Sequence, residues 1–180
     1  MLPLELPGGY RLRHVEEGDA DGIWQVVDAN RDHLGEWLPW VPLSSPETIR
    51  DFIGRARMQA AADDGFQAVI LDPSGAVAGF IGFHSVDWNN RATSLGYWLA
   101  EGQQGRGTMT QAVRALTALA FEEWGLNRVE IRVAPANARS GAIPKRLGFV
   151  KEGVLRQAER HGDEFKDSAV YSMLADEWES

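Results

Sequence analysis

The stretch from residue 93 to residue 133 constrains the fold most strongly, because its hydrophobic pattern changes period twice. Thr93–Leu99 reads as a short strand, and apolar residues then recur at helical spacing between Met109 and Trp124. Arg128–Val133 follows, with charged and apolar residues in strict alternation. A strand, a helix and a second strand in this order predict one right-handed parallel crossover within a sheet.

The segment before this crossover predicts an antiparallel meander. Phe66–Leu71, Val77–His84 and Thr93–Leu99 are strand-like, and the turns Asp72–Gly75 and Trp88–Arg91 separate them. The other expected elements are strands at Tyr10–Val15, Phe149–Arg156 and Phe165–Leu174, and helices after Asp19, from Pro46 to just before Gly65, and at Ala138–Arg146. We therefore expect a single α+β (mixed α/β) domain over residues 1–180, with a mostly antiparallel sheet, one central parallel pair and about four helices.

The composition excludes several classes of protein. The 180 residues include no cysteine, which excludes disulfides, thiolate metal sites and a cysteine nucleophile. The net charge of −8 argues against a nucleic-acid partner, and no apolar run approaches the roughly 20 residues of a membrane span. The histidines His14, His33, His84 and His161 lack metal-ligand spacing. We expect a cytoplasmic protein with no metal, no nucleic-acid partner and no membrane partner.

A glycine-rich loop lies between the last strand of the meander and the long helix. Glycines allow backbone N–H groups to converge, and a helix N-terminus adds about half a positive charge, so the loop predicts a pyrophosphate site. A P-loop needs a Gly-Lys dipeptide, which does not occur, and a Rossmann fingerprint needs a small residue where Thr110 stands. A plain glycine-rich turn remains the alternative. The candidate binding residues are Gln104, Gly105, Arg106, Gly107, Thr108, Met109 and Thr110.

Motifs in both halves of the chain resemble the GNAT superfamily of N-acetyltransferases, over about Tyr10 to Leu174. Gln104 and Gly107 match the family's Gln/Arg-x-x-Gly-x-Gly/Ala signature, whereas Met109 replaces its final small residue. That replacement is familiar in the RimJ/RimL-like branch, which acetylates the N-termini of ribosomal proteins. Further marks of this branch are Trp37-Leu38-Pro39-Trp40, Asn137-x-x-Ser140 and Ile143-Pro144-Lys145-Arg146-Leu147-Gly148-Phe149.

The resemblance implies where acetyl-CoA binds. The two parallel strands splay apart in a twisted GNAT-like sheet, and the pantetheine arm pairs with the backbone near Trp98 and Leu99. The pyrophosphate meets the N–H groups of the glycine-rich loop, and Asn137 binds the arm from the other wall. Asn137 can also serve as the N-cap of the helix that follows it, and the two roles are compatible.

The resemblance also implies the chemistry. Ser140 protonates the leaving thiolate, a task that a tyrosine performs in many relatives, and Glu159 is the general base for the amine. Glu152 and His161 are alternative bases. In isolation, Ser140 could be a helix-surface serine and Glu159 a solvated loop residue. The tyrosines Tyr10, Tyr97 and Tyr171 all lie outside the stretch around Ser140.

Trp37 and Trp40 are candidates for the acceptor wall, and core packing is the alternative for both. The resulting hypothesis is an enzyme that moves the acetyl group directly to a primary amine, such as a protein N-terminus. Polyamines, aminoglycosides and other small amines are alternative acceptors. A non-catalytic acyl-CoA-binding module and, less favoured, a nucleotide-binding enzyme are alternative functions. A homodimer is compatible with the sequence.

Overall fold

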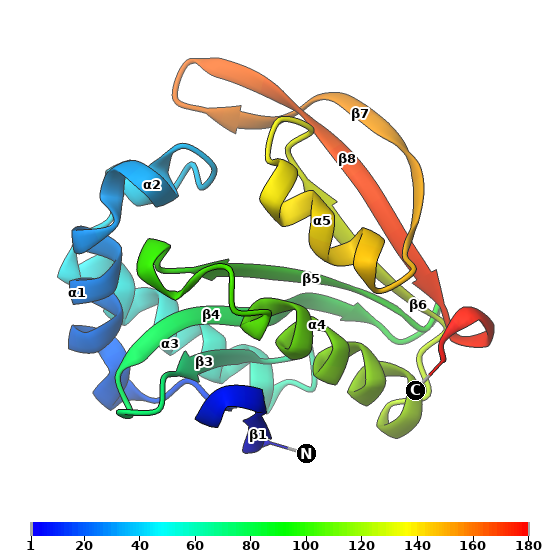
Figure 1. The fold of residues 1–180 in the computed structure, drawn as a ribbon, viewed down its shortest axis with the longest axis horizontal. Helices are drawn as coiled ribbons and strands as arrows, with labels where there is room; N and C mark the ends of the chain where they lie inside the picture. The colour runs from blue at the N-terminus through cyan, green and yellow to red at the C-terminus, as the bar shows by residue number, and fades with distance from the viewer. Residues whose placement is uncertain (1, 180) are drawn as a thin grey trace.

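The computed structural model describes residues 2–179, which form one twisted eight-stranded sheet in the order β1-β2-β3-β4-β5-β6-β8-β7 (Figure 1). The strands are β1 (Leu4–Leu6), β2 (Tyr10–His14), β3 (Gln67–Leu71), β4 (Val77–Asp87), β5 (Ala92–Leu99), β6 (Arg128–Val133), β7 (Val150–His161) and β8 (Glu164–Leu174). β5 and β6 pair in parallel, and every other neighbouring pair is antiparallel. The predicted meander, crossover and fold class are therefore confirmed.

Residues 2–179 form five α-helices around the sheet, one more than expected. They are α1 (Ala20–Ala29), α2 (Arg31–Gly35), α3 (Pro46–Ala61), α4 (Thr108–Ala118) and α5 (Ala138–Arg146). The additional helix α2 has no counterpart among the elements expected from the sequence. The helical pattern that was expected to run as far as Trp124 divides into α4 and a π-helical turn, Leu119–Glu123. In Figure 1, α4 and α5 lie in front of the sheet, and α3 lies behind it.

Two apolar cores follow from the alternation of side chains along the strands. On one face, Val69 of β3 packs with Ile23 of α1 and Ile53 of α3. On the other face, Ile81 of β4 packs with Leu116 of α4. All of these side chains are at most 2% exposed, and burial of each contributes about 1.5–3 kcal/mol to folding. The central sheet is thereby fixed between two helical layers.

The parallel pair is short, and this shortness positions the site. Ala92–Leu95 of β5 pair with Arg128–Ile131 of β6, and the ladder stops there. Beyond Leu95, β5 remains paired with β4 as far as Leu99, while β6 continues beside β8 to Val133. β4 carries a register shift between Phe83 and Val86, at the level where the parallel ladder stops. A bulge of this kind increases local twist, which favours the divergence of the strands.

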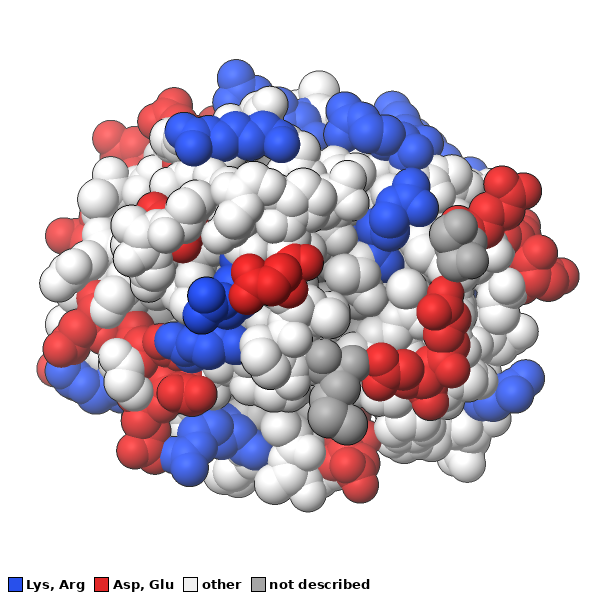
Figure 2. Space-filling model, turned by 60° about the horizontal axis from the view of Figure 1, so that its bottom comes forward, with Lys and Arg blue, Asp and Glu red and all other residues white. Residues whose placement is uncertain are grey.

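The C-terminal hairpin is longer than expected. β7 continues to His161, so Glu159 lies in a strand rather than in a loop. β7 ends the sheet and is exposed along most of its length. A homodimer, with which the sequence is compatible, is not tested by the structure of this one chain. None of the helices in residues 2–179 is long and apolar enough to cross a membrane. On the face shown in Figure 2, basic side chains lie mainly along the top and acidic side chains gather on the right, while the two signs alternate at the lower left.

Candidate active site

A cleft of about 1420 Å³ opens where β5 and β6 part. It is lined by α2, β5, the glycine-rich loop, α5 and β7. The predicted site residues that line it are Trp37, Trp98, Leu99, Gln104, Gly105, Arg106, Gly107, Thr108, Met109, Thr110, Asn137, Ser140 and Glu159. Trp40 does not line the cleft and is 40% exposed. The structure therefore brings together residues that are more than 120 positions apart in the sequence.

The glycine-rich loop leads directly into the N-terminus of α4. Gly105 and Gly107 both have φ of +78°, a left-handed conformation that glycine adopts without strain. Gly107 is the N-cap of α4 and supplies no side-chain acceptor, so the first N–H groups of the helix have no cap. An uncapped helix N-terminus lining a cleft favours an anion there.

Three arginines surround this loop, of which only Arg106 was expected from the sequence. Arg139 Nη1 of α5 donates to Gln104 Oε1 at 2.7 Å, and Arg146 Nη1 donates to Thr110 Oγ1 at 2.9 Å. All three arginines line the cleft. Arg139 and Arg146 are seven positions apart on one helix, and this spacing places them on the same face. That spacing was the available sequence signal for a cationic wall.

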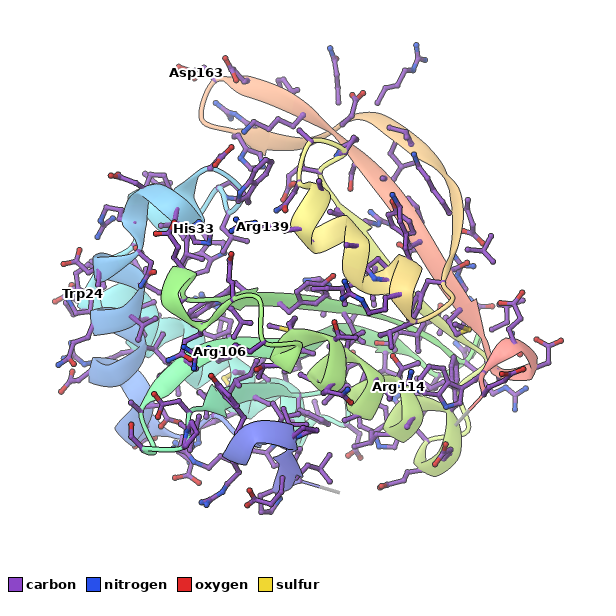
Figure 3. The ribbon with its side chains drawn as sticks, in the orientation of Figure 1. Trp24, His33, Arg106, Arg114, Arg139 and Asp163 are labelled. Carbon is purple, nitrogen blue, oxygen red and sulfur yellow. The ribbon has the colours of Figure 1, made fainter. Side chains whose placement is uncertain are left out.

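His33 of α2 extends this polar network across the mouth of the cleft. Its Nε2 lies 2.7 Å from Gln104 Nε2, and Gln104 also accepts from Arg139. Figure 3 shows His33 and Arg139 facing each other from α2 and α5. On the same side, Lys166 Nζ of β8 donates to the carbonyl oxygen of Glu36 at 3.2 Å. The C-terminal hairpin and the α2 region are thus linked near the cleft.

The edge of β5 that faces the cleft has no neighbouring strand within the described chain beyond Leu95. Gly96–Leu99 pair with β4 on one side only. Trp98 stacks on Phe80, with ring centroids 6.3 Å apart and an interplanar angle of 9°. An open strand edge of this kind can hydrogen-bond an extended molecule as an added strand.

The N-terminus of α5 holds Ser140 beside Tyr97 of β5. Asn137 Oδ1 accepts from the Ser140 backbone N–H at 3.0 Å, so Asn137 caps the helix and also lines the cleft. Ser140 Oγ donates to the Tyr97 hydroxyl at 3.4 Å. Burial raises the pKa of Tyr97 to about 12, which keeps it protonated at neutral pH. Tyr97 was not expected here from the sequence, because only the parallel crossover brings these two residues together.

Of the candidate bases, Glu159 lines the cleft and Glu152 does not. Glu152 accepts from Arg128 Nη1 and Nη2 at 2.7 and 2.6 Å, and this guanidinium lowers the pKa of Glu152 to about 2. His161 Nε2 lies 3.2 Å from Glu159 Oε2, and the His161 side chain is 8% exposed. His84 of β4 also lines the cleft, although no sequence motif pointed to it. Among residues 2–179, no three His, Asp or Glu side chains are grouped to hold a metal ion.

Comparisons with known proteins agree with this geometry. A family model described as an acetyltransferase (GNAT) domain matches residues 10–150. YdaF of Bacillus subtilis (strain 168), named as a candidate ribosomal N-acetyltransferase, is 38% identical over 170 residues, which cover 93% of this chain and 92% of YdaF. The ribosomal-protein-serine acetyltransferase of Escherichia coli (strain K12) is 27% identical over 96% of this chain and 97% of its own. A structure of RimL, a ribosomal L7/L12 α-N-protein acetyltransferase in complex with coenzyme A, superposes with a TM-score of 0.91 at 25% identity, covering 98% of this chain and 99% of that one.

The left-handed conformation of Gly107 allows a direct test of the anion site. Gly107→Ala adds a methyl group to a residue with φ of +78°, and this left-handed conformation costs a non-glycine residue about 1–2 kcal/mol of stability. The methyl group also lies where a phosphate would approach the backbone. Gly75→Ala is the matched control, because Gly75 has φ of +87° in the turn between β3 and β4 and an equally open surrounding. We expect similar losses of melting temperature in both variants, but weaker acetyl-CoA binding by calorimetry only for Gly107→Ala. Equal affinity in the two variants would place the phosphate site elsewhere.

Proposed function

The chain belongs to the GNAT acetyltransferase family, and on this premise we propose that it transfers the acetyl group of acetyl-CoA to the N-terminal amine of a ribosomal protein. It is an acyl-CoA-dependent N-acetyltransferase. The observation that carries the proposal is the cleft between the parted strands β5 and β6, which is lined both by the arginines around the start of α4 and by Glu159 of β7. The names of YdaF and of the Escherichia coli relative support a ribosomal acceptor.

From the residues that line the cleft, we infer where each part of acetyl-CoA binds. The pyrophosphate binds the N–H groups at the start of α4, with Arg106, Arg139 and Arg146 supplying positive charge. The pantetheine arm lies along the open edge at Trp98 and Leu99 and pairs with it as a strand would. The thioester then lies near the N-terminus of α5, where Ser140 is held by its neighbours.

The transfer needs two proton movements, and our proposal gives these roles to Glu159 and Ser140. The acceptor ammonium gives up one proton to Glu159, directly or through an intervening group, because only the neutral amine can attack the thioester carbon. The new C–N bond forms and the C–S bond breaks. The departing thiolate takes a proton from Ser140, and the second proton of the nitrogen returns through water to Ser140. No covalent enzyme intermediate is involved.

Acetyl-CoA is expected to stabilise the folded protein. At a ligand concentration 100 times Kd, binding contributes about 2.7 kcal/mol, which in a chain of this size corresponds to a rise in melting temperature of roughly 5–10 °C. Thermal denaturation with acetyl-CoA, CoA and NAD checks this. Both CoA compounds should shift the transition, whereas NAD should not. A transition that neither CoA compound moves would contradict the proposed use of the cleft.

Glu159→Gln keeps the size of the side chain and removes its basicity, so kcat should fall by about 10²–10⁴-fold near neutral pH. The deficit should shrink at high pH as the acceptor amine loses its proton without help. Glu152→Gln makes the same change on the same strand, but outside the cleft, and should leave kcat unchanged. Thiol release from acetyl-CoA, followed across pH with an N-terminal peptide, measures both variants. A kcat of Glu159→Gln within about twofold of the parent would contradict a role for Glu159 in proton transfer, because loss of a general base typically lowers kcat by about 10²–10⁴-fold.

Trp37→Ala should raise the KM for the acceptor and leave the affinity for acetyl-CoA nearly intact, because Trp37 lines the cleft beside α2. Trp40→Ala is the matched control, since Trp40 lies in the same segment but outside the cleft. Kinetics with an N-terminal ribosomal peptide, a polyamine and an aminoglycoside also distinguish the three acceptor classes. Preferred turnover of a polyamine or an aminoglycoside would refute the ribosomal acceptor. Equal acceptor KM values in the two tryptophan variants would refute the role of Trp37 in acceptor binding.

A further inference from the structure

His84 lies at a register shift of β4 that is stabilised by hydrogen bonds from neighbouring side chains. The register shift between Phe83 and Val86 frees two backbone carbonyls. Gln59 Nε2 donates to the carbonyl oxygens of Phe83 and His84 at 2.8 and 3.0 Å, and Gln67 Nε2 donates to that of Phe83 at 2.6 Å. Two amide side chains, from α3 and β3, therefore fix the backbone that carries the imidazole.

The imidazole ring is also fixed at its other nitrogen. His84 Nδ1 lies 3.0 Å from Ser94 Oγ on the neighbouring strand β5. The ring covers Gly96, because a Cβ atom at Gly96 would lie only 2.6 Å from His84 Nε2. Gly96 is the first residue of β5 beyond the parallel ladder, where the open edge begins. When Nδ1–H donates to Ser94, Nε2 keeps its lone pair at the point where β5 leaves β6.

Charged groups from two other strands act on this imidazole. Partial burial lowers the pKa of His84 below its ordinary value of 6.5, and the guanidinium of Arg132 on β6 lowers it further. The carboxylate of Glu159 on β7 acts in the opposite direction and favours the protonated ring. His84 is therefore neutral at pH 7, and a proton that it accepts is stabilised by Glu159.

We propose that His84 Nε2 is the group that takes the proton from the acceptor ammonium, with Glu159 stabilising the imidazolium that forms. This inference rests on the proposed function and refines its first step. The N–H bond of the ammonium breaks, an Nε2–H bond forms, and the freed amine attacks the thioester carbon. After the transfer, His84 releases this proton to water, while the second proton of the nitrogen goes to the thiolate by way of Ser140.

The ordinary pKa values of the groups favour this assignment. An N-terminal amine has a pKa of about 7.7–8.0, an imidazole about 6.5 and a glutamate about 4.3. A general base works best when its pKa is close to that of the group it deprotonates and to the working pH. A neutral imidazole is thus a better match for the ammonium than an isolated carboxylate, while the carboxylate is the better counter-ion.

The test is the pH dependence of kcat/KM for the parent and His84→Gln, measured by thiol release with an N-terminal peptide. In the parent, kcat/KM should fall on the acid side of the pH profile, at a pH below 6.5 where His84 becomes protonated. His84→Gln should lose about 10²-fold or more in kcat and should no longer show the acid limb of the parent. The matched control is His14→Gln, because the pKa of His14 on β2 is also lowered by desolvation, but its side chain does not line the cleft. The profile of this control should match that of the parent.

Ser94→Ala is a milder second variant. It removes the partner of Nδ1, so Nε2 is no longer held in one protonation state, and kcat should fall several-fold with unchanged affinity for acetyl-CoA. A parent-like kcat in Ser94→Ala, or an acid limb of His84→Gln at the same pH as in the parent, would overturn the role of His84. Either result leaves the acetyltransferase proposal standing, whereas a parent enzyme that turns over no amine would overturn the proposed function itself.

Discussion

The parting of β5 and β6 after four residue pairs is the constraint on which the rest of the site depends. A strand edge in the interior of a sheet normally pairs all of its backbone groups, because an unpaired polar group costs free energy when it is shielded from water. Here Gly96–Leu99 keep one partner strand and leave the other edge open to the cleft. The proposed binding of the pantetheine arm along this edge would supply the missing partner.

Both helices of the cleft begin at its walls, and their N-termini are used differently. α4 begins at Gly107 without a side-chain cap, which leaves its N–H groups for an anion. α5 begins at Asn137, whose side chain satisfies the N–H of Ser140 and so fixes the serine instead. The chain has a net charge of −8, yet three arginines surround the loop before α4. The local charge, rather than the net charge, decides which ligand the cleft attracts.

The sequence predicted those features that depend on local patterns. The change of period across Thr93–Val133, from strand to helix to strand, identified the crossover. The glycines at 105 and 107 marked the loop, but only the motifs in both halves of the chain distinguished it from a plain glycine-rich turn. The residues that the sequence did not reveal are those whose place depends on irregular geometry. His84 enters the cleft through a shift in strand register, and Tyr97 meets Ser140 across 43 residues of sequence. Hydrophobic periodicity does not show where a strand has a bulge or which residues a crossover brings into contact. The family motifs pointed to Ser140 but not to Tyr97 beside it.

The charged side chains of the cleft also bear on where the two proposed substrates would bind. Arg106, Arg139 and Arg146 concentrate positive charge at the end where α4 begins, and this repels a cationic acceptor while it attracts phosphates. Glu159 of β7 lines the same cleft, and it acts on His84 against the guanidinium of Arg132. Under the proposed mechanism, the acceptor ammonium gives up its proton beside these groups and then meets the thioester where β5 leaves β6. The divergence of the two strands would then serve both substrates, as an open edge for acetyl-CoA and as the place where the amine becomes neutral.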